Sequence, residues 1–393
     1  MNRTVSGIDH LLAQPEKYLQ GKTVGLVVNH TSLAGDGRHS IEHFHSHSAF
    51  TLQALFAPEH GLYGTAQDMI HIADEVDPLS GLNIKSLYGN DKDSLTPDPA
   101  SLAGIDNLVF DIQDVGARYY TFIYTMANCM AICKQAGTRM VVCDRPNPIN
   151  GASVEGNLVG DPWRSFVGQY PLPNRHGMTA GELAHLFNEH FEIHCDLTVV
   201  PMTGWNREMW YDQTGLVWTP PSPNMPTLAT ATVYPGMCLI EGTQLSEGRG
   251  TTLPFEQIGA PFIDPHKLKS RLDAEPLPGV FFRPQFFMPM FQKHAGEVCA
   301  GVQLHITDRE SFKPLLTTIA LLRALAQMYP DQLQWRTEPY EFVSDRLAID
   351  LLYGNPELRE TIFNDDFSLE ELENSWQEEL AGFKTLRKNF LIY

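Results

Sequence analysis

The sequence contains no long apolar run. None of its hydrophobic stretches approaches the roughly 20 consecutive apolar residues that a helix needs to cross a bilayer. The N-terminal segment, MNRTVSGIDHLLAQPEKYLQ, also lacks the apolar core of a secretory signal peptide. The sequence therefore predicts a cytoplasmic protein without membrane insertion, or a periplasmic or secreted one if a signal lies upstream of these residues.

Positive charge is scarce. The chain has 28 lysines and arginines against 47 aspartates and glutamates, a formal net charge of −19, and its basic residues form no run or stripe. Nucleic acids and anionic membranes are bound by concentrated positive charge, so this balance argues against both as partners. An anionic ligand would have to be met by a few arginines that act locally.

Several well-known catalytic motifs are missing as well. No G-x-G-x-x-G follows the first expected strand, so no dinucleotide-binding fingerprint is present. No H-E-x-x-H occurs, and His190 and His194 lack an evident third ligand, so no metal site is expected. The absence of a G-x-S-x-G elbow argues against an α/β-hydrolase. We therefore expect a protein that uses neither a metal nor a cofactor.

The six cysteines give no sign of disulfides. Most lie in apolar surroundings such as NCMAIC (128–133) and MVVC (140–143). Cysteines in such surroundings behave as small buried hydrophobic residues. The sequence therefore predicts buried, reduced thiols.

The chain is rich in hydrophobic residues, and these are arranged in short runs. Of its 393 residues, 43% are hydrophobic and 19% are charged, which is typical of a packed protein with room for two domains. Runs that are apolar on both faces alternate with helical patterns, and this alternation indicates a parallel sheet covered on both sides. The runs are 24–28, 52–57, 107–112, 140–143 and 197–200, and the expected helices lie near 38–47, 98–104, 119–136 and 180–191.

The pattern changes after the proline-rich stretch TPPSPNMP (219–226). Beyond about residue 231, strands such as GVFF and GVQLHIT mix with helices near 310–328 and 368–388. We predict an α/β protein in which residues 1–230 form a Rossmann-like parallel sheet with helices on both faces, carrying the catalytic loops. Residues 231–393 are expected to form a smaller C-terminal α+β domain that closes the cleft. The segment 61–97 does not fit the alternation and is expected to run over the ligand edge of the sheet.

Polar residues directly follow each of the five apolar runs. In a parallel sheet these positions all lie at the carboxyl edge, where open α/β sheets bind ligands. Such loops can also simply cap helices, which would account for a residue such as Asn29. Helix capping explains clustered Glu-His and Asp-Arg pairs poorly, so we predict a site at this edge. Its candidates are Asn29, Glu59, His60, Asp111, Asp114, Arg118, Asp144, Arg145 and Asn147.

The loops of the chain carry carboxylates, arginines, aromatic residues and histidines, and these residue types suit a sugar site. Two carboxyl groups can supply the acid and the base or nucleophile of glycoside hydrolysis. Glu59 is the best candidate for the acid, because it follows an apolar strand and partial burial favours the protonated form. His60 could tune that role or share it.

The second carboxyl group has two candidates at the next strand. Asp111 lies at the end of the run 107–112, and Asp114 follows it. Asp111 could equally be a buried structural residue paired with Arg118 or Arg145. The sequence leaves this choice open.

Six segments together resemble a known family, the exo-acting β-N-acetylmuramidases of glycoside hydrolase family 171. The likeness runs from about residue 20 to the C-terminus, and its motifs are long and uncommon. The resemblance implies a Rossmann-like domain and a smaller C-terminal domain with the site between them. It also implies the release of N-acetylmuramic acid from the non-reducing ends of peptidoglycan fragments without a cofactor. The segments are FAPEHGLYG (56–64), VFDIQDVGARYYTFIYTM (109–126), DRPNPINGASVEG (144–156), RHGMTAGELA (175–184), PPSPNMPT (220–227) and YPGMCLIEGTQLSEGRGTTLPFE (234–256).

The resemblance also implies roles for single residues. Glu59 stands in the family's E-H-G motif and is carried over as the catalytic residue. Asp111, Asp114 and Glu247 are alternatives for the second catalytic group, in that order. One feature departs from the family, because its members are often exported whereas this N-terminus shows no signal.

A positive partner is needed for the sugar itself. N-acetylmuramic acid differs from N-acetylglucosamine by a lactyl carboxylate, and arginine can bind a carboxylate through two parallel N–H bonds. The candidates for this contact are Arg118, Arg145, Arg175 and Arg249. Tyr120 is a candidate sugar platform, and further candidate substrate contacts are Asn29, Asp144, Asn147, His176, Ser222, Asn224 and Glu247.

The sequence therefore predicts an enzyme that acts on muramic-acid-containing glycans. Glu59 would protonate the leaving oxygen of a terminal β-linked N-acetylmuramoyl residue, and a second carboxylate or the substrate's acetamido group would stabilise the transition state. One alternative is a non-catalytic muropeptide-binding or sensing protein that uses the same cleft. Another is a cell-wall hydrolase that acts on the lactyl-peptide arm, which would need a nucleophile or a metal.

Overall fold

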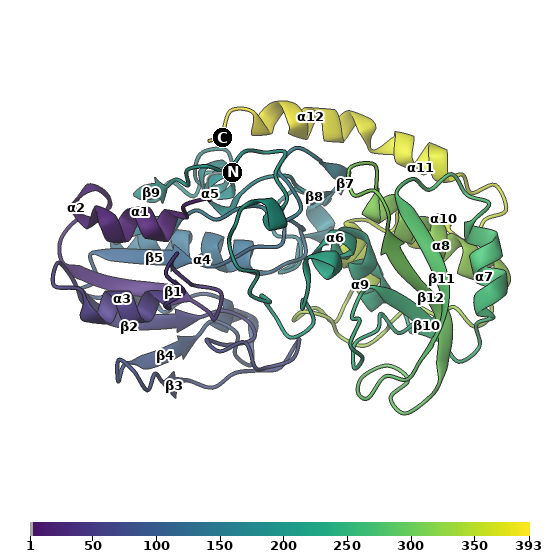
Figure 1. Ribbon diagram of the computed structural model, residues 1–393, viewed down its shortest axis with the longest axis horizontal. Helices are drawn as coiled ribbons and strands as arrows, with labels where there is room; N and C mark the ends of the chain where they lie inside the picture. Colours follow the sequence, from purple (N-terminus) through teal and green to yellow (C-terminus); the bar gives the residue numbers. More distant parts are fainter. Residues whose placement is uncertain (1–2) are drawn as a thin grey trace.

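A mainly parallel sheet forms the first half of the molecule in the computed structural model, which describes residues 3–393 (Figure 1). Its seven strands have the order β3-β4-β2-β1-β5-β6-β9, and only the β3–β4 pair is antiparallel. All five predicted apolar runs are strands of this sheet. The strands are β1 (Thr23–Val28), β2 (Thr51–Ala57), β3 (Glu75–Val76), β4 (Asn83–Ser86), β5 (Asn107–Asp111), β6 (Arg139–Cys143) and β9 (Leu197–Val200).

Helices cover both faces of this sheet, as the apolar runs predicted. Successive residues of a strand point to opposite faces. Leu26 of β1 accordingly belongs to one buried cluster with Ile8 and Phe44, whereas Val27 belongs to another with Met126. The first face is covered by α1 (Gly7–Ala13) and α3 (Ser40–Ser46), and the second by α4 (Phe122–Ala136) and α5 (Ala180–Glu189). A short helix, α2 (Pro15–Tyr18), follows α1.

Local sequence sets where these helices begin and end. Helix α5 begins with a capping box in which the Thr179 and Glu182 side chains bond each other's backbone N–H groups. Helix α4 ends at Gly137, which has φ 71° in the left-handed region that glycine adopts without strain. The helix expected near 98–104 is only a 3₁₀ turn, η2 (Pro99–Leu102).

The segment 61–97 extends the sheet as well as approaching its ligand edge. It contributes β4, which pairs with β2, and β3, which pairs with β4 at the outer edge. A 3₁₀ turn, η1 (Lys92–Leu95), follows these strands. Before β3 the chain passes through Asp68 and Met69, which lie close to residues of the C-terminal half. Part of the expected excursion is therefore regular strand.

The C-terminal half is a smaller α+β unit. Its antiparallel sheet has the order β10-β12-β11 and is packed against helices (Figure 1). The strands are β10 (Gln257–Ala260), β11 (Val280–Phe287) and β12 (Cys299–Ile306). The helices are α6 (Leu228–Met237), α7 (Pro265–Leu272), α8 (Pro314–Met328), α9 (Ala348–Tyr353), α10 (Glu357–Thr361), α11 (Leu369–Ser375) and α12 (Gln377–Arg387). The predicted domain boundary at 230/231 falls inside α6.

The two halves share one hydrophobic core. Phe110 of β5 and Leu321 of α8 belong to the same buried cluster, so the junction is packed. A small antiparallel pair, β7 (Glu155–Leu158) with β8 (Pro173–Arg175), lies between the halves, and α12 contacts β7. The remaining 3₁₀ turns are η3 (Asp161–Trp163), η4 (Tyr211–Gln213) and η5 (Cys238–Gly242).

The cysteines lie in the interior, as their apolar surroundings in the sequence predicted. All six cysteines are free and buried. Among residues 3–393, no helix is both long enough and apolar enough to cross a bilayer.

Candidate active site

A cavity that opens to solvent lies at the junction of the two halves, and it and its mouth together hold about 500 Å³ of space not occupied by protein atoms. The N-terminal half contributes the loop after β2, the turn before α4 and the proline-rich stretch around residue 222. The C-terminal half contributes α6, η5 and the two loops that carry Arg249 and Glu341. The lining polar and aromatic residues are Glu59, His60, Asp68, Tyr119, Tyr120, Thr121, Phe122, Ser222, Asn224, Tyr234, Glu241, Arg249, Phe255, Tyr340 and Glu341.

Glu59 is held in this cavity by the element that follows β2. It comes two residues after the end of the strand, and only 6% of its surface is exposed. The hydroxyl of Thr121, the residue that precedes α4, donates to Glu59 Oε2 at 2.8 Å. The Met69 backbone N–H approaches Oε1 at a longer 3.4 Å. The carboxyl group is therefore oriented through one oxygen, while the other has only a long contact.

The backbone next to Glu59 is unusual. His60 has φ 69°, and its ring Nδ1 lies 2.9 Å from the carbonyl oxygen of Ala66, to which it donates. Phe255 and Glu341, which also line the cavity, have φ values of 62° and 46°. Non-glycine residues in this region are strained, and such strain tends to gather at functional sites. The cavity brings three of them together.

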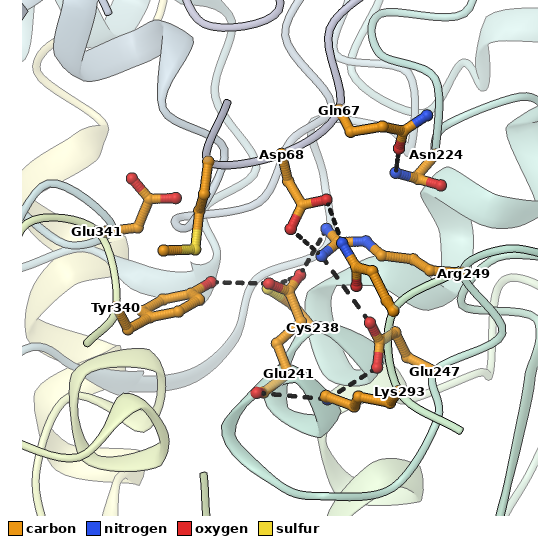
Figure 2. Close-up of polar contacts among 12 residues, drawn as sticks. Gln67, Asp68, Asn224, Cys238, Glu241, Glu247, Arg249, Lys293, Tyr340 and Glu341 are labelled. Carbon is orange, nitrogen blue, oxygen red and sulfur yellow. Dashed lines mark hydrogen bonds and ion pairs between the residues drawn. The ribbon is translucent and has the colours of Figure 1, made fainter. Parts of the chain in front are cut away.

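A cluster of charges surrounds Arg249, as Figure 2 shows. Its Nη1 donates to Asp68 Oδ2 at 2.6 Å, and its Nη2 donates to Glu241 Oε1 at 3.1 Å. Glu247 lies 3.8 Å from Nη1 and is also paired with Lys293 at 2.9 Å. Burial raises the pKa of Glu241, and the nearby Arg249 only partly offsets this effect. Asp68 links the N-terminal half to this C-terminal cluster.

Glu341 is a second buried carboxyl group in the cavity. It is 5% exposed, and its Oε2 accepts the hydroxyl of Tyr88 at 2.8 Å. Burial raises the pKa of Glu341 well above its usual range, and the charge of Glu59 raises it further. In Figure 2 its carboxyl group lies apart from the charges around Arg249. The sequence analysis missed it because nothing in the local sequence TEPYEFV resembles a catalytic motif.

Six of the predicted site residues line the cavity, and the others do not. Those that line it are Glu59, His60, Tyr120, Ser222, Asn224 and Arg249. Those outside its lining are Asn29, Asp111, Asp114, Arg118, Asp144, Arg145, Asn147, Arg175, His176 and Glu247. The lining residues that the sequence analysis did not identify include Asp68, Thr121, Glu241, Tyr340 and Glu341.

Asp111 is engaged in a structural pair, one of the two alternatives that the sequence left open. It is fully buried and accepts Arg145 Nε at 2.7 Å and Nη2 at 2.9 Å. The Ser40 hydroxyl donates to Oδ2, the oxygen that also accepts Arg145 Nη2. Because Asp111 and Arg145 satisfy each other away from the cavity, the expectation that they contact substrate conflicts with their positions.

Arg118 and Asp144 also hold the fold together. Arg118 is completely buried and donates to the carbonyl oxygens of four residues, two in each half: Asn157, Leu172, Leu352 and Tyr353. Asp144 accepts hydrogen bonds from Thr179, Gly181 and Tyr393 around the start of α5. Burial raises the pKa of Asp144 to about 6. Their polar groups are thus occupied by the protein itself.

The remaining residues outside the cavity have local partners. Asn29 bonds Thr31, Asn147 bonds Met178, and Asp114 accepts the Gly116 N–H at 2.7 Å, with His176 3.4 Å away. Arg175 donates to the Ile149 carbonyl oxygen, and Glu247 is paired with Lys293. Among residues 3–393, no group of three or more histidine, cysteine or acidic side chains is arranged to hold a metal ion.

Two family models and one named relative match the chain over nearly its whole length. The family model "Exo-beta-N-acetylmuramidase NamZ, N-terminal" matches residues 24–229, and its C-terminal counterpart matches residues 232–393. The chain is 45% identical over 388 residues to the peptidoglycan β-N-acetylmuramidase NamZ of Bacillus subtilis (strain 168), covering 99% of this chain and 91% of that protein.

Two crystal structures share the whole fold. Both are DUF1343 family proteins of Bacteroides fragilis NCTC 9343. One matches with a TM-score of 0.88 and 34% identity, and the other with a TM-score of 0.77 and 28% identity. Each match covers 100% of this chain and 99% of the other. The two-domain arrangement is therefore that of solved relatives.

Proposed function

The chain belongs to the exo-β-N-acetylmuramidase family and is a glycosidase, and we propose that Glu59 is its catalytic acid. In this proposal it releases terminal N-acetylmuramic acid from peptidoglycan fragments. The observation that carries the assignment is the position of Glu59, which is buried in the cavity at the domain junction and oriented by Thr121. Of the four carboxyl groups proposed from sequence for catalysis, Glu59 alone lines that cavity.

The geometry of Glu59 suits proton donation. Thr121 occupies Oε2, which leaves Oε1, with its longer 3.4 Å contact, to carry the proton. The proton passes to the glycosidic oxygen as the bond from that oxygen to the sugar C1 breaks, and the bonding electron pair stays with the leaving sugar. Water then adds to C1 of the oxocarbenium-like sugar and loses a proton. The Thr121 hydroxyl stabilises the Glu59 carboxylate that results.

The lactyl carboxylate is assigned to Arg249. Among the four candidate arginines, only Arg249 lines the cavity, whereas Arg118, Arg145 and Arg175 are occupied by the fold. Arg249 already faces three carboxylates, so a substrate carboxylate must replace one of them. Asp68 is the partner to be exchanged, because it comes from a loop of the other half and bonds Arg249 through a single nitrogen.

The arrangement supports the sugar platform and polar contacts only in part. Tyr120 lines the cavity and packs edge-to-face on Phe122 and Tyr234, with ring centroids 4.9 and 5.8 Å away. Asn224 donates to Gln67 at 2.8 Å, so the loop after β2 and the proline-rich stretch are tied together beside the site. Tyr120, Ser222 and Asn224 are therefore retained as proposed substrate contacts.

A chromogenic N-acetylmuramide, assayed beside the matching N-acetylglucosaminide, tests this function. We expect release of the chromophore from the muramide, a much slower release from the glucosaminide, and no loss of rate on addition of a chelator. Saturable binding of the muramide without release would favour the sensing alternative. Release of the lactyl-linked peptide from a muropeptide, with the glycosidic bond intact, would favour the other hydrolase.

A further inference from the structure

We infer that Asp68 sets the sugar specificity of the site, because it competes from within the protein for the place of the substrate's lactyl carboxylate. Asp68 occupies Arg249 until a muramic acid residue displaces it. This inference rests on the proposed assignment of the lactyl group to Arg249. The exchange gives the site a means of refusing N-acetylglucosamine, which has no carboxylate to offer.

Asp68 presents to Arg249 the same functional group that the substrate would present. Its Oδ2 accepts Arg249 Nη1 at 2.6 Å beside the cavity that both residues line (Figure 2). When one carboxylate replaces another, the guanidinium group keeps the same number of charged partners. A sugar that displaced Asp68 without supplying a carboxylate would leave Arg249 with one partner fewer, which is costly for a buried charge. The Nε of Arg249 is also buried and bonds no acceptor within residues 3–393, so the protein does not use all of its donors.

The other two carboxylates at Arg249 are held in place by further bonds within the C-terminal half. Glu241 accepts the Tyr340 hydroxyl at 2.9 Å. Glu247 is paired with Lys293 at 2.9 Å. Their side chains are only 5% and 2% exposed. Neither can leave Arg249 without disrupting the buried cluster that positions the guanidinium group.

Asp68 has a more exposed position. It belongs to the segment between β2 and β3, in the other half of the molecule, and its side chain is 12% exposed. The Gln292 amide donates to its second oxygen, Oδ1, at 2.7 Å in a contact that is open to solvent. Asp68 can therefore be released from Arg249 into water while the buried cluster stays intact.

The exchange needs only the Asp68 side chain to move, because the backbone on either side of it is anchored. Gln67 accepts the Asn224 amide at 2.8 Å, and the Met69 side chain packs partly against the core. The carboxylate of Asp68, in contrast, is tied only by polar contacts at the edge of the cavity. Rotation of one side chain from a buried arginine to solvent therefore opens the position for the lactyl group.

The test is the binding of two free sugars, N-acetylmuramic acid and N-acetylglucosamine, to the full chain by isothermal titration calorimetry. Asp68→Asn keeps the shape of the side chain, but a hydrogen bond from Arg249 to its neutral amide oxygen is about half as strong as one to a carboxylate. Less of the protein is then held in the occluded form, so N-acetylmuramic acid should bind about tenfold more tightly. The affinity for N-acetylglucosamine should not change. Unchanged affinity for N-acetylmuramic acid, or weaker binding of both sugars, would overturn the inference.

Gln292→Ala separates competition from charge repulsion. Loss of the Asp68 charge would favour an anion even if Asp68 never moved. Gln292 lies outside the cavity lining, and its removal keeps that charge while freeing one of the two anchors of Asp68. We expect N-acetylmuramic acid to bind about two- to threefold more tightly to this variant. No change in Gln292→Ala, beside tighter binding in Asp68→Asn, would mean that Asp68 acts by repulsion alone and is not exchanged.

Asp74→Asn is the matched control. Asp74 is exposed in the same segment and accepts the Ser86 N–H at 3.0 Å, so the variant removes an equal charge away from Arg249. Both affinities should stay at their wild-type values, and a tenfold gain here would attribute the effect of Asp68→Asn to net charge. If Asp68→Asn does not fold, Gln292→Ala and this control carry the test.

Failure of the proposed function has a different signature. Cleavage of the disaccharide N-acetylmuramyl-N-acetylglucosamine by the wild type reports on that function separately from the binding of free sugars. The expected affinities without cleavage would keep the exchange and refute the glycosidase mechanism. Undiminished affinity of Arg249→Lys for N-acetylmuramic acid would refute the assignment of Arg249, and the exchange with it.

Discussion

Glu59→Gln should separate proton donation from every other role of the side chain. Glutamine has nearly the same shape, and its amide oxygen can still accept the Thr121 hydroxyl that orients Glu59 at 2.8 Å. The change also adds no charge to a cavity that four carboxyl groups share with one guanidinium, so folding should not suffer. General acid catalysis contributes about 10²–10⁴ in rate, or roughly 3–5 kcal/mol. We expect a loss of this size in kcat on the disaccharide.

The assay compares two leaving groups. The sugar of N-acetylmuramyl-N-acetylglucosamine leaves only when its oxygen is protonated, whereas nitrophenolate leaves readily without a proton. Glu59→Gln should therefore lose much more activity on the disaccharide than on the nitrophenyl muramide, while substrate binding changes little. Disaccharide cleavage within tenfold of the wild type would refute the assignment. Equal losses on both substrates would show that Glu59 does something other than donate a proton.

Three further predictions concern Arg249, Arg118 and Glu155. Arg249→Lys keeps the positive charge but loses the planar guanidinium group, which can donate two parallel hydrogen bonds to a carboxylate. The inhibition constant of N-acetylmuramic acid as a competitive inhibitor should therefore rise about tenfold, and that of N-acetylglucosamine should not change. Arg118→Met should lower the free energy of unfolding by about 3–5 kcal/mol in a denaturant titration, because four buried carbonyl oxygens lose their donor. The folded-state pKa of Glu155 is about 7 against an ordinary 4.5, so its stabilising contribution is complete below pH 4.5 and is lost as the pH rises through 7. We therefore compare the free energy of unfolding of Glu155→Gln with that of the wild type at pH 4.5 and above pH 7. The difference should shift by about 3 kcal/mol in favour of the variant at the higher pH, and a difference that does not change with pH would contradict this.

Much of the N-terminal half follows from local sequence. Strands buried on both faces have to be apolar throughout, so each strand of the sheet's centre appears as a short continuous run, and the residue after it falls at the ligand edge. This reasoning placed Glu59 correctly at that edge. The same reasoning could not distinguish Glu59 from Asp111, because both follow apolar runs and only the tertiary fold pairs Asp111 with Arg145.

The C-terminal contribution to the site was beyond such reasoning. Glu241 comes from the 3₁₀ turn η5 and Glu341 from a loop further along the chain, and neither residue follows a parallel strand. The four candidate arginines likewise look alike in sequence. Three of them are hydrogen-bonded to carbonyl or carboxylate oxygens inside the protein. Arg249 is the one that lines the cavity, and it does so because of how the two halves pack. Which polar group is free for a ligand depends on contacts formed over long sequence separations.

The most direct measurement is a crystal structure of Glu59→Gln with the intact disaccharide bound. The account predicts the glycosidic oxygen within about 2.6–3.2 Å of the side chain at position 59, with the lactyl carboxylate on Arg249 in place of Asp68. A sugar seated with its glycosidic oxygen out of reach of position 59 would contradict it.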